Sequence, residues 1–131
     1  MSKEIQAEMP FVAEVTVPMP AEHVQFIESL NTLTEQIHNN AKSKGWWDTD
    51  RNDGELICLM HSELSEALEG LRHGNPPSDH IPEFSAAEEE LSDTLIRVLD
   101  MAGARGYRIG EAVIAKMIFN SKRPHKHGKN F

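Results

Sequence analysis

The chain has 131 residues, of which 39% are hydrophobic and 26% charged, and its formal net charge is −8. This length suits one domain with a modest core, and the acidic balance argues against nucleic acid as the main partner. No stretch reaches the length of a membrane span and the N-terminus lacks the apolar region of a signal peptide, so we expect a cytoplasmic protein without a membrane partner. The single cysteine, Cys58, lies in an apolar run, so we expect it to pack in the core.

The first 20 residues differ from the rest because prolines at positions 10, 18 and 20 rule out a continuous helix. The run FVAEVTV alternates only weakly and allows a short strand or an extended segment. We therefore expect an irregular or extended N-terminal arm at 1–20, an all-α domain at 21–123 and a basic C-terminal tail at 124–131.

Apolar spacing and capping signals predict helices in the rest of the chain. The first predicted helix spans about 20–44, and Gly45 is a typical stop. The second spans about 54–72, with Asn52 or Asp53 in position to cap its first turn.

Two further helices follow. Ser85 and Glu88 predict a capping box for the third, which reaches about Arg105. The fourth spans about 109–121, and Pro124 blocks its continuation. Four helices with short connections predict an all-α fold, an antiparallel four-helix bundle.

Two pairs of acids stand out on the second and third helices, Glu63 with Glu66 and Glu90 with Asp93. The members of each pair are three residues apart, which makes them neighbours on one helix face. If apolar stripes pack these two helices together, four carboxylates meet at one point. Carboxylate oxygens in such a group suit a hard divalent cation.

Glu63 falls inside the apolar arc of its helix rather than on the outer face. The arc contains Leu56, Leu59, Met60, Leu64, Ala67 and Leu71, and the stripe of the third helix contains Leu91, Leu95, Val98, Met101 and Ala102. A lone buried carboxylate is costly or shifts its pKa. A cation should therefore compensate Glu63, either a metal ion or a basic side chain such as Arg97 or Arg105.

Two other groups of residues suggest a ligand. Trp46 and Trp47 stand in a polar loop, and we expect one ring to pack in the core and the other to line a pocket, where it can stack on a base. Lys116, Asn120 and Arg123 fall near one face at the end of the fourth helix. Basic and polar groups near a metal suit a polyphosphate.

The order of these motifs resembles the MazG-like nucleoside triphosphate pyrophosphohydrolases of the all-α NTP pyrophosphatase superfamily. The similar runs, within about residues 35–131, are GWWDTDRNDGELICLMHSELSEALEGLRHGN, EEELSDTLIRVLD and KMIFNSKRPHKHGKNF. The family pattern is EExxE followed by ExxD, and Glu63 and Glu66 take the second and third acids of its first motif. Glu90 and Asp93 match the second motif, while Ser62 stands where the family often has the leading glutamate.

The resemblance implies hydrolysis of a nucleoside triphosphate to the monophosphate and pyrophosphate, as in nucleotide-pool housecleaning. The four acids would then hold Mg²⁺, or Mn²⁺ as a substitute, and Glu63 and Glu66 would take part in catalysis. Glu89 or Asp100 is a candidate auxiliary carboxylate in place of the missing glutamate.

The resemblance also implies how a nucleotide would be held. Lys116, Asn120 and Arg123 correspond to positions that approach the phosphates, and Trp46 or Trp47 would stack on the base. Family members assemble as homodimers or homotetramers in which helices of neighbouring chains complete the pocket. We expect a homodimer or homotetramer here as well.

Other classes of function compete with this interpretation. A non-catalytic, metal-dependent nucleotide-binding protein or oligomeric adaptor would explain Ser62. A helical scaffold would use its acids only to pair with arginines. A di-iron carboxylate bundle needs Glu-x-x-His on two helices, and the predicted helices hold that motif once, at Glu35 and His38.

Overall fold

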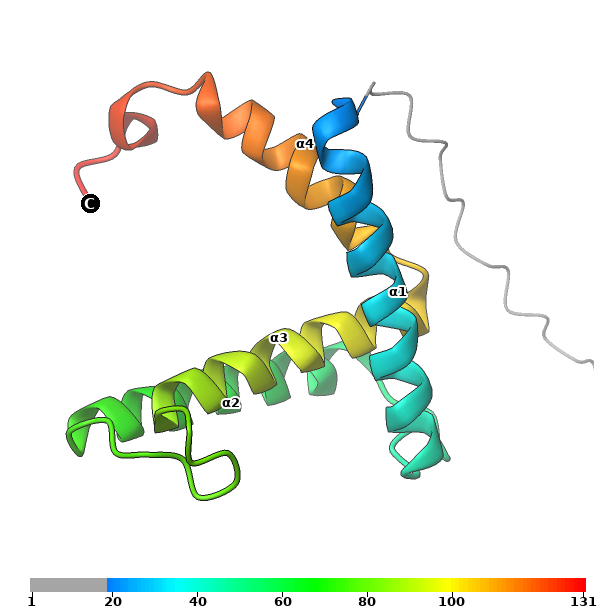
Figure 1. Ribbon diagram of the computed structural model, residues 1–131, viewed down its shortest axis with the longest axis vertical. Helices are drawn as coiled ribbons and strands as arrows, with labels where there is room; N and C mark the ends of the chain where they lie inside the picture. Colours follow the sequence, from blue (N-terminus) through cyan, green and yellow to red (C-terminus); the bar gives the residue numbers. More distant parts are fainter. Residues whose placement is uncertain (1–18) are drawn as a thin grey trace, which may run out of the picture.

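Four α-helices and a short 3₁₀ helix make up the part of the chain that the computed structural model describes, residues 19–131. They are α1 (Ala21–Ser43), α2 (Asp53–Arg72), α3 (Ala86–Arg105), α4 (Ile109–Ser121) and η1 (His125–Gly128) (Figure 1). The predicted all-α fold with four packed helices is therefore confirmed. The arm predicted at 1–20 lies outside the described residues, apart from its last two.

The helix ends agree with the sequence because local capping decides them. The side chain of Asn52 accepts a hydrogen bond of 2.8 Å from the backbone N–H of Glu55 at the start of α2. Ser85 and Glu88 form the predicted capping box at the start of α3. Gly106 ends α3 with φ of 69°, a left-handed conformation that glycine adopts without a Cβ clash.

Helices α2 and α3 form an antiparallel hairpin. At one end a Cβ on Gly70 would lie only 3.0 Å from that of Ala86, so the two backbones approach closely. At the other end the Nε of Arg105 donates to Asp53 at 2.8 Å. The buried apolar side chains of the hairpin are Leu56, Ala67, Ala87, Leu99, Met101 and Ala102. The hairpin therefore has its own small core.

Helix α1 connects the hairpin to α4. Its C-terminal half crosses the end of α3, where a Cβ on Gly103 would lie 2.7 Å from that of His38. Its N-terminal half contacts α4, and Asn31 donates to Glu111 at 3.0 Å. In Figure 1, α4 and the hairpin consequently extend as two arms from α1. Among the described helices, none is both long and apolar enough to cross a membrane.

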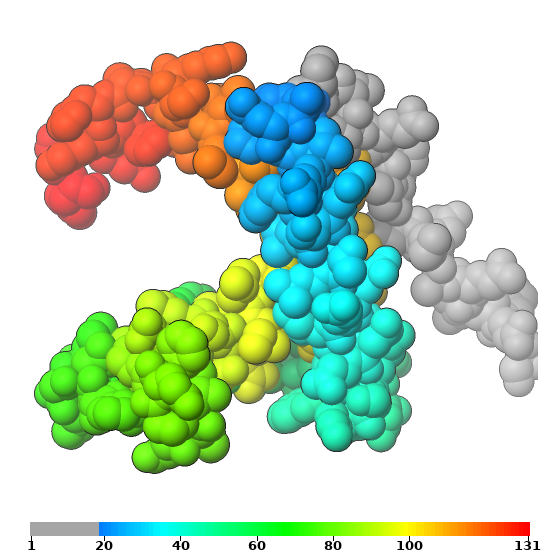
Figure 2. All heavy atoms as spheres, viewed as in Figure 1, coloured from blue at the N-terminus to red at the C-terminus, as the bar shows by residue number. Residues whose placement is uncertain are grey.

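A wide hollow separates α4 from the hairpin (Figure 2). Large apolar side chains are exposed on both arms. On the hairpin they include Ile57, Leu64, Leu68, Leu71, Leu91 and Leu95, and on α4 they are Val113, Met117 and Phe119. One chain thus leaves much of its apolar surface in water.

Five burial predictions made from the sequence are wrong for the single chain. Leu64 and Leu71 belong to the predicted apolar arc of α2 but are exposed. Leu91 and Leu95 belong to the predicted core stripe of α3, yet each is more than half exposed. Cys58 is exposed as well. The physical reason is geometric, because the apolar arcs of α2 and α3 are wider than the strip that one neighbouring helix covers.

Candidate metal centre between α2 and α3

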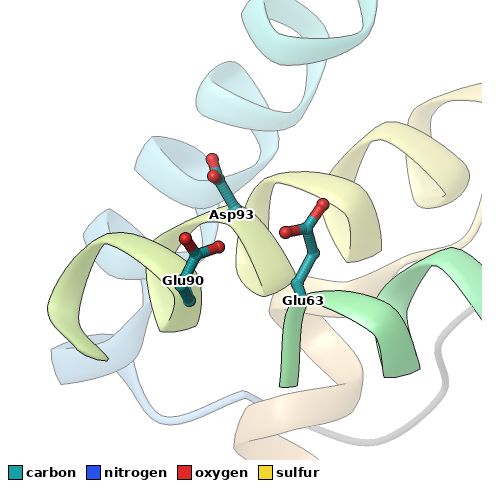
Figure 3. A group of neighbouring side chains, drawn as sticks. All are labelled: Glu63, Glu90 and Asp93. Carbon is teal, nitrogen blue, oxygen red and sulfur yellow. The ribbon is translucent and has the colours of Figure 1, made fainter. Parts of the chain in front are cut away.

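Three carboxyl groups meet where the middle of α2 faces α3. Glu63 comes from α2, and Glu90 and Asp93 lie one turn apart on α3; all three side chains point to the same side of the hairpin (Figure 3). One carboxylate oxygen of each residue lies within 4.8 Å of the other two. We call these three residues the acid triad. Its spacing lets three oxygens share one cation.

Glu63 is the most deeply placed member of the acid triad. It is 7% exposed, which confirms that it lies inside the packed face of α2. Its Oε1 accepts a hydrogen bond of 2.5 Å from the Nε of Arg97, one turn beyond Asp93 on α3. Of the two predicted arginine partners, Arg97 thus pairs with the triad, whereas Arg105 binds Asp53 and the backbone oxygen of Arg51.

The acid triad carries more negative charge than Arg97 neutralises. Burial, followed by the carboxyl groups of Glu63 and Glu66, raises the pKa of Glu90 to about 7. Burial also raises the pKa of Asp93, and the charges of Glu63 and Glu89 add to this effect. Both shifts mean that the folded site resists holding all of its carboxylates in the ionised form.

The hydrogen bonding of the Glu90 carboxyl bears on whether the acid triad suits a metal ion. Its Oε2 is buried and accepts no hydrogen bond from a donor group among the described residues, since the groups beside it are the carboxyls of Glu63 and Glu66. Buried polar atoms are normally satisfied, so such an atom calls for an explanation. A divalent cation bound by the acid triad would satisfy the oxygen and supply the missing positive charge.

The fourth predicted acid lies at the edge of this group. Glu66 is exposed on α2, one turn after Glu63, and it is close enough to Glu90 to raise the pKa of that residue. The structure therefore brings three of the four predicted ligands together and places Glu66 beside them.

A pocket of about 440 Å³ opens from the acid triad toward the C-terminal half of α1. Its lining includes Glu63, Asp93, Arg97, Asp100, Trp46 and Arg51, together with Gln36, Ile37, Asn40 and Ala41 of α1. Trp46 is exposed and the guanidinium of Arg51 lies 5.6 Å from its ring centroid. A flat aromatic wall next to acids and arginines can hold a planar ring and a charged group together.

Trp47 has a different environment from Trp46. Its Nε1 donates to the two carboxylate oxygens of Asp100, at 3.0 and 3.1 Å. His38 bonds the same carboxylate through Nδ1 at 2.8 Å. Asp100 therefore ties α1, the loop after it and α3 together. The histidine of the single Glu-x-x-His motif, His38, thus takes part in this hydrogen-bond network.

Both candidates for an auxiliary carboxylate are engaged by other groups. Asp100 is held by Trp47 and His38, as described above. Glu89 accepts a hydrogen bond from Ser78 and is bonded to Nδ1 of His80 at 2.5 Å. No local pattern could have revealed these contacts, because the partners are separated by 9 to 62 positions along the chain.

The structure does not bring the predicted phosphate-binding residues to the acid triad of the same chain. Lys116 and Asn120 line a shallow groove on α4, and α4 packs on the half of α1 that is distant from the triad. Lys116 and Arg123 lie over the ring of Phe119, with 4.5 and 5.6 Å between the cationic group and the ring centroid.

The chain matches no protein-family model, and no curated protein or solved structure is significantly similar to it. The fold and site define an all-α, four-helix protein with an acidic cluster able to hold a metal ion. Any narrower assignment depends on the motifs of the sequence and on the geometry of this site.

Proposed function

We propose that the chain is a Mg²⁺-dependent nucleoside triphosphate pyrophosphohydrolase, which converts a (deoxy)nucleoside triphosphate and water to the monophosphate and pyrophosphate in nucleotide-pool housecleaning. The observation that carries the proposal is the buried acid triad with an unsatisfied oxygen on Glu90, opening into a pocket walled by Trp46. The motif order that resembles the MazG-like enzymes supports the same activity.

In this proposal the acid triad, with Glu66 at its edge, holds Mg²⁺ or Mn²⁺. When bound, the ion neutralises phosphate charge and lowers the pKa of a coordinated water. Because the metal ion compensates the charge of Glu63, the guanidinium of Arg97 can bind a phosphate oxygen instead. Its planar donors are well suited to phosphate. Arg97 would thus hold the reacting phosphate beside the triad.

Trp46 is the better candidate to bind the base. Its exposed ring lines the pocket, and a stacked base typically contributes about 1–3 kcal/mol. Trp47 is bonded to Asp100 and forms a rigid support behind the pocket. The two adjacent tryptophans would therefore divide the roles of ligand contact and scaffold.

We further propose that the protein works as a homodimer or homotetramer in which α4 of one chain approaches the acid triad of another. Supporting observations are the apolar surfaces left exposed on the hairpin and on α4. Exposed patches of this kind typically mark contact surfaces. This arrangement would deliver Lys116, Asn120 and Arg123 to the phosphates from the neighbouring chain.

The test is to incubate pure protein with each NTP and dNTP in Mg²⁺ or Mn²⁺ and to separate pyrophosphate from orthophosphate. We expect pyrophosphate and the monophosphate, and we expect Glu63→Gln to abolish turnover while the helical circular dichroism stays intact. Glu69→Gln is the control, because Glu69 is an exposed acid on the same helix. Orthophosphate alone, or no product from any nucleotide, would overturn the proposal.

A second candidate is a non-catalytic nucleotide-binding protein or oligomeric adaptor. It is favoured by one observation: Ser62 is exposed and donates to the backbone oxygen of Leu59 at 2.7 Å, while Glu89 and Asp100 are both engaged elsewhere. Calorimetry would then detect Mg²⁺-dependent nucleotide binding without product formation. Rapid release of pyrophosphate would eliminate this candidate.

A further inference from the structure

The loop between α2 and α3 holds a polar cluster that the proposed function does not use, formed by Ser78, His80 and Glu89. Ser78 is 4% exposed although it lies in a loop. Its hydroxyl donates to Glu89 Oε2 and accepts from the backbone N–H groups of His80 and Ile81, both at 3.1 Å. These bonds fold the loop against the first turns of α3.

His80 is the exposed end of this cluster. Its side chain is 84% exposed, yet its Nδ1 lies 2.5 Å from Glu89 Oε1. The hydrogen bond and charge of Glu89 raise the pKa of His80, and the charges of Asp79 and Asp93 add to this effect. With Nδ1 committed to Glu89, the second ring nitrogen, Nε2, remains to bind something outside the cluster.

Stability of the loop does not explain this arrangement. Glu89 is only 15% exposed, but its partner ring is 84% exposed, and ion pairs that reach water in this way contribute little to the free energy of unfolding. Ser78 already anchors the loop to Glu89 through a buried hydroxyl, and its backbone N–H bonds Phe84 at 2.8 Å. The exposed ring of His80 is therefore an addition to a loop that Ser78 already holds.

The position of the cluster along α3 relates it to the acid triad. Glu89 precedes Asp93 by one turn and Arg97 follows it by one turn, so the three lie near one face and successive members are about 6 Å apart along the helix axis. A basic side chain therefore lies at each end of the triad, Arg97 at one end and His80, paired with Glu89, at the other.

The position of the pocket indicates which end of a nucleotide would lie next to Arg97 and which end would lie next to Glu89. Trp46, Arg97 and Asp100 line the pocket, so a base held there lies at the Arg97 end. The phosphate nearest the sugar then meets the acid triad. The pocket lining reaches Glu63 and Asp93 but not His80, so phosphates that extend beyond the triad along α3 would leave the pocket on the side of His80.

We propose that His80 binds the two terminal phosphates of the substrate, the pyrophosphate that leaves, and that Glu89 and Ser78 hold its ring in place. This inference rests on the proposed function and names the contact at the far end of the same site. The ring donates from Nε2 to a phosphate oxygen, a charge-assisted bond. His80 thus distinguishes a triphosphate from a monophosphate.

The test measures binding of Mg²⁺ with inorganic pyrophosphate, and separately with nucleoside monophosphate, by calorimetry. We expect His80→Ala to weaken pyrophosphate binding by roughly tenfold or more and to leave monophosphate binding within about twofold. His73→Ala is the matched control, because His73 is an exposed histidine that also pairs with a glutamate, Glu69, at 3.3 Å. His80→Lys, which keeps a cation, should restore part of the affinity, and melting curves check that each variant is folded.

The outcomes separate this inference from the proposed function. If the wild-type protein binds neither nucleotide nor pyrophosphate in Mg²⁺, the proposed function fails and His80 fails with it. If the wild type binds both but His80→Ala and His73→Ala behave alike, the inference alone is overturned. Equal losses for monophosphate and pyrophosphate in His80→Ala would also overturn it, because they indicate a structural role.

Discussion

The α2–α3 hairpin and helix α4 differ in how much of their apolar sequence is buried within the chain. The hairpin buries apolar side chains from both of its helices, caps each helix at its start and pairs its deepest acid, Glu63, with Arg97. Helix α4 buries only Gly110 and Ile114, although it is the most apolar of the four helices. The hairpin therefore has its own core and acid triad within one chain, although Leu68 and Leu91 on its outer faces stay exposed, whereas α4 buries little against the rest of the chain.

This difference has a functional consequence. The acid triad can be preorganised by a single chain, because its three members come from two helices that pack on each other. The basic residues of α4 lie away from the triad of their own chain, and in the proposed assembly they reach the triad of a neighbouring chain. Mixed oligomers, core truncations, pH titration and tryptophan variants test this difference between the two regions.

The largest effect should come from mixing two inactive variants. Glu63→Gln removes one carboxylate of the acid triad and leaves α4 unchanged. The double variant Lys116→Ala, Arg123→Ala removes two basic groups of α4 and leaves the triad unchanged. If α4 acts on the neighbouring chain, mixed dimers hold one intact site of two, and a random mixture recovers about a quarter of wild-type activity. Co-expression with two affinity tags and a pyrophosphate-release assay would measure it.

The control for this experiment is a mixture of Glu63→Gln with Glu90→Gln. Both changes damage the hairpin, so no arrangement of the two chains restores an acid triad, and activity should stay absent. Recovery in neither mixture would show that α4 does not serve the site of a neighbour. Equal recovery in both would point to reversion or contamination and would also remove the support for a shared site.

A second prediction contrasts the cores of the two regions. Leu99 is 0% exposed on α3, so Leu99→Ala should lower the free energy of unfolding by about 2–5 kcal/mol. Met117 is more than half exposed on α4, and Met117→Ala should cost less than about 1 kcal/mol in dilute solution. Urea denaturation at low protein concentration would measure both. A large loss for Met117→Ala would mean that α4 is already covered in the state that unfolds.

A third prediction concerns pH. The pKa of Glu90 is raised from 4.5 to about 7 in the folded chain, so between these values the folded state binds more protons than the unfolded state. Without a divalent ion, stability should therefore fall as pH rises through this window, by up to about 3 kcal/mol. Mg²⁺ should reverse the loss at pH 8, because it compensates the ionised triad.

The variant Glu90→Gln isolates this effect, since it removes the titrating group and keeps its shape. The difference in unfolding free energy between wild type and Glu90→Gln should change across pH 5 to 8, whereas Glu55→Gln, at an exposed position, should follow the wild type. Parallel pH curves for wild type and Glu90→Gln would contradict the raised pKa of Glu90.

The smallest expected effects separate the two tryptophans. Trp47→Phe removes the N–H that bonds Asp100 and should cost about 1 kcal/mol of stability. Trp46→Ala should leave stability nearly unchanged and weaken nucleotide binding by about 1–3 kcal/mol. Thermal melting and calorimetry measure the two quantities. The assignment is reversed if Trp47→Phe affects binding alone and Trp46→Ala affects stability alone.

Several features of the site could be predicted from the sequence because they depend on neighbours along the chain. The i,i+3 spacing of Glu90 and Asp93 places them one turn apart on any helix, and the capping box at Ser85 positions that helix. Burial of Glu63 followed from its place among apolar residues on α2. These features needed only helical periodicity.

Other features depend on which surfaces meet in space. The sequence offered Arg97 and Arg105 as equal partners for the acids, and only the packing of α2 on α3 selected Arg97. The contact of His38 with Asp100 spans 62 positions, and His80 reaches Glu89 because the loop folds back on α3. Such contacts have no local signal.

Four helices, their ends and the face on which two pairs of acids lie follow from local sequence, because hydrogen bonding and apolar periodicity act within a few residues. The tertiary structure alone decided that three of those acids converge while Glu66 stays at the edge, and that α4 lies on the other arm. It also left Leu91 and Leu95 in water, since the angle at which α1 joins the hairpin and α4 determines which apolar faces a single chain can cover.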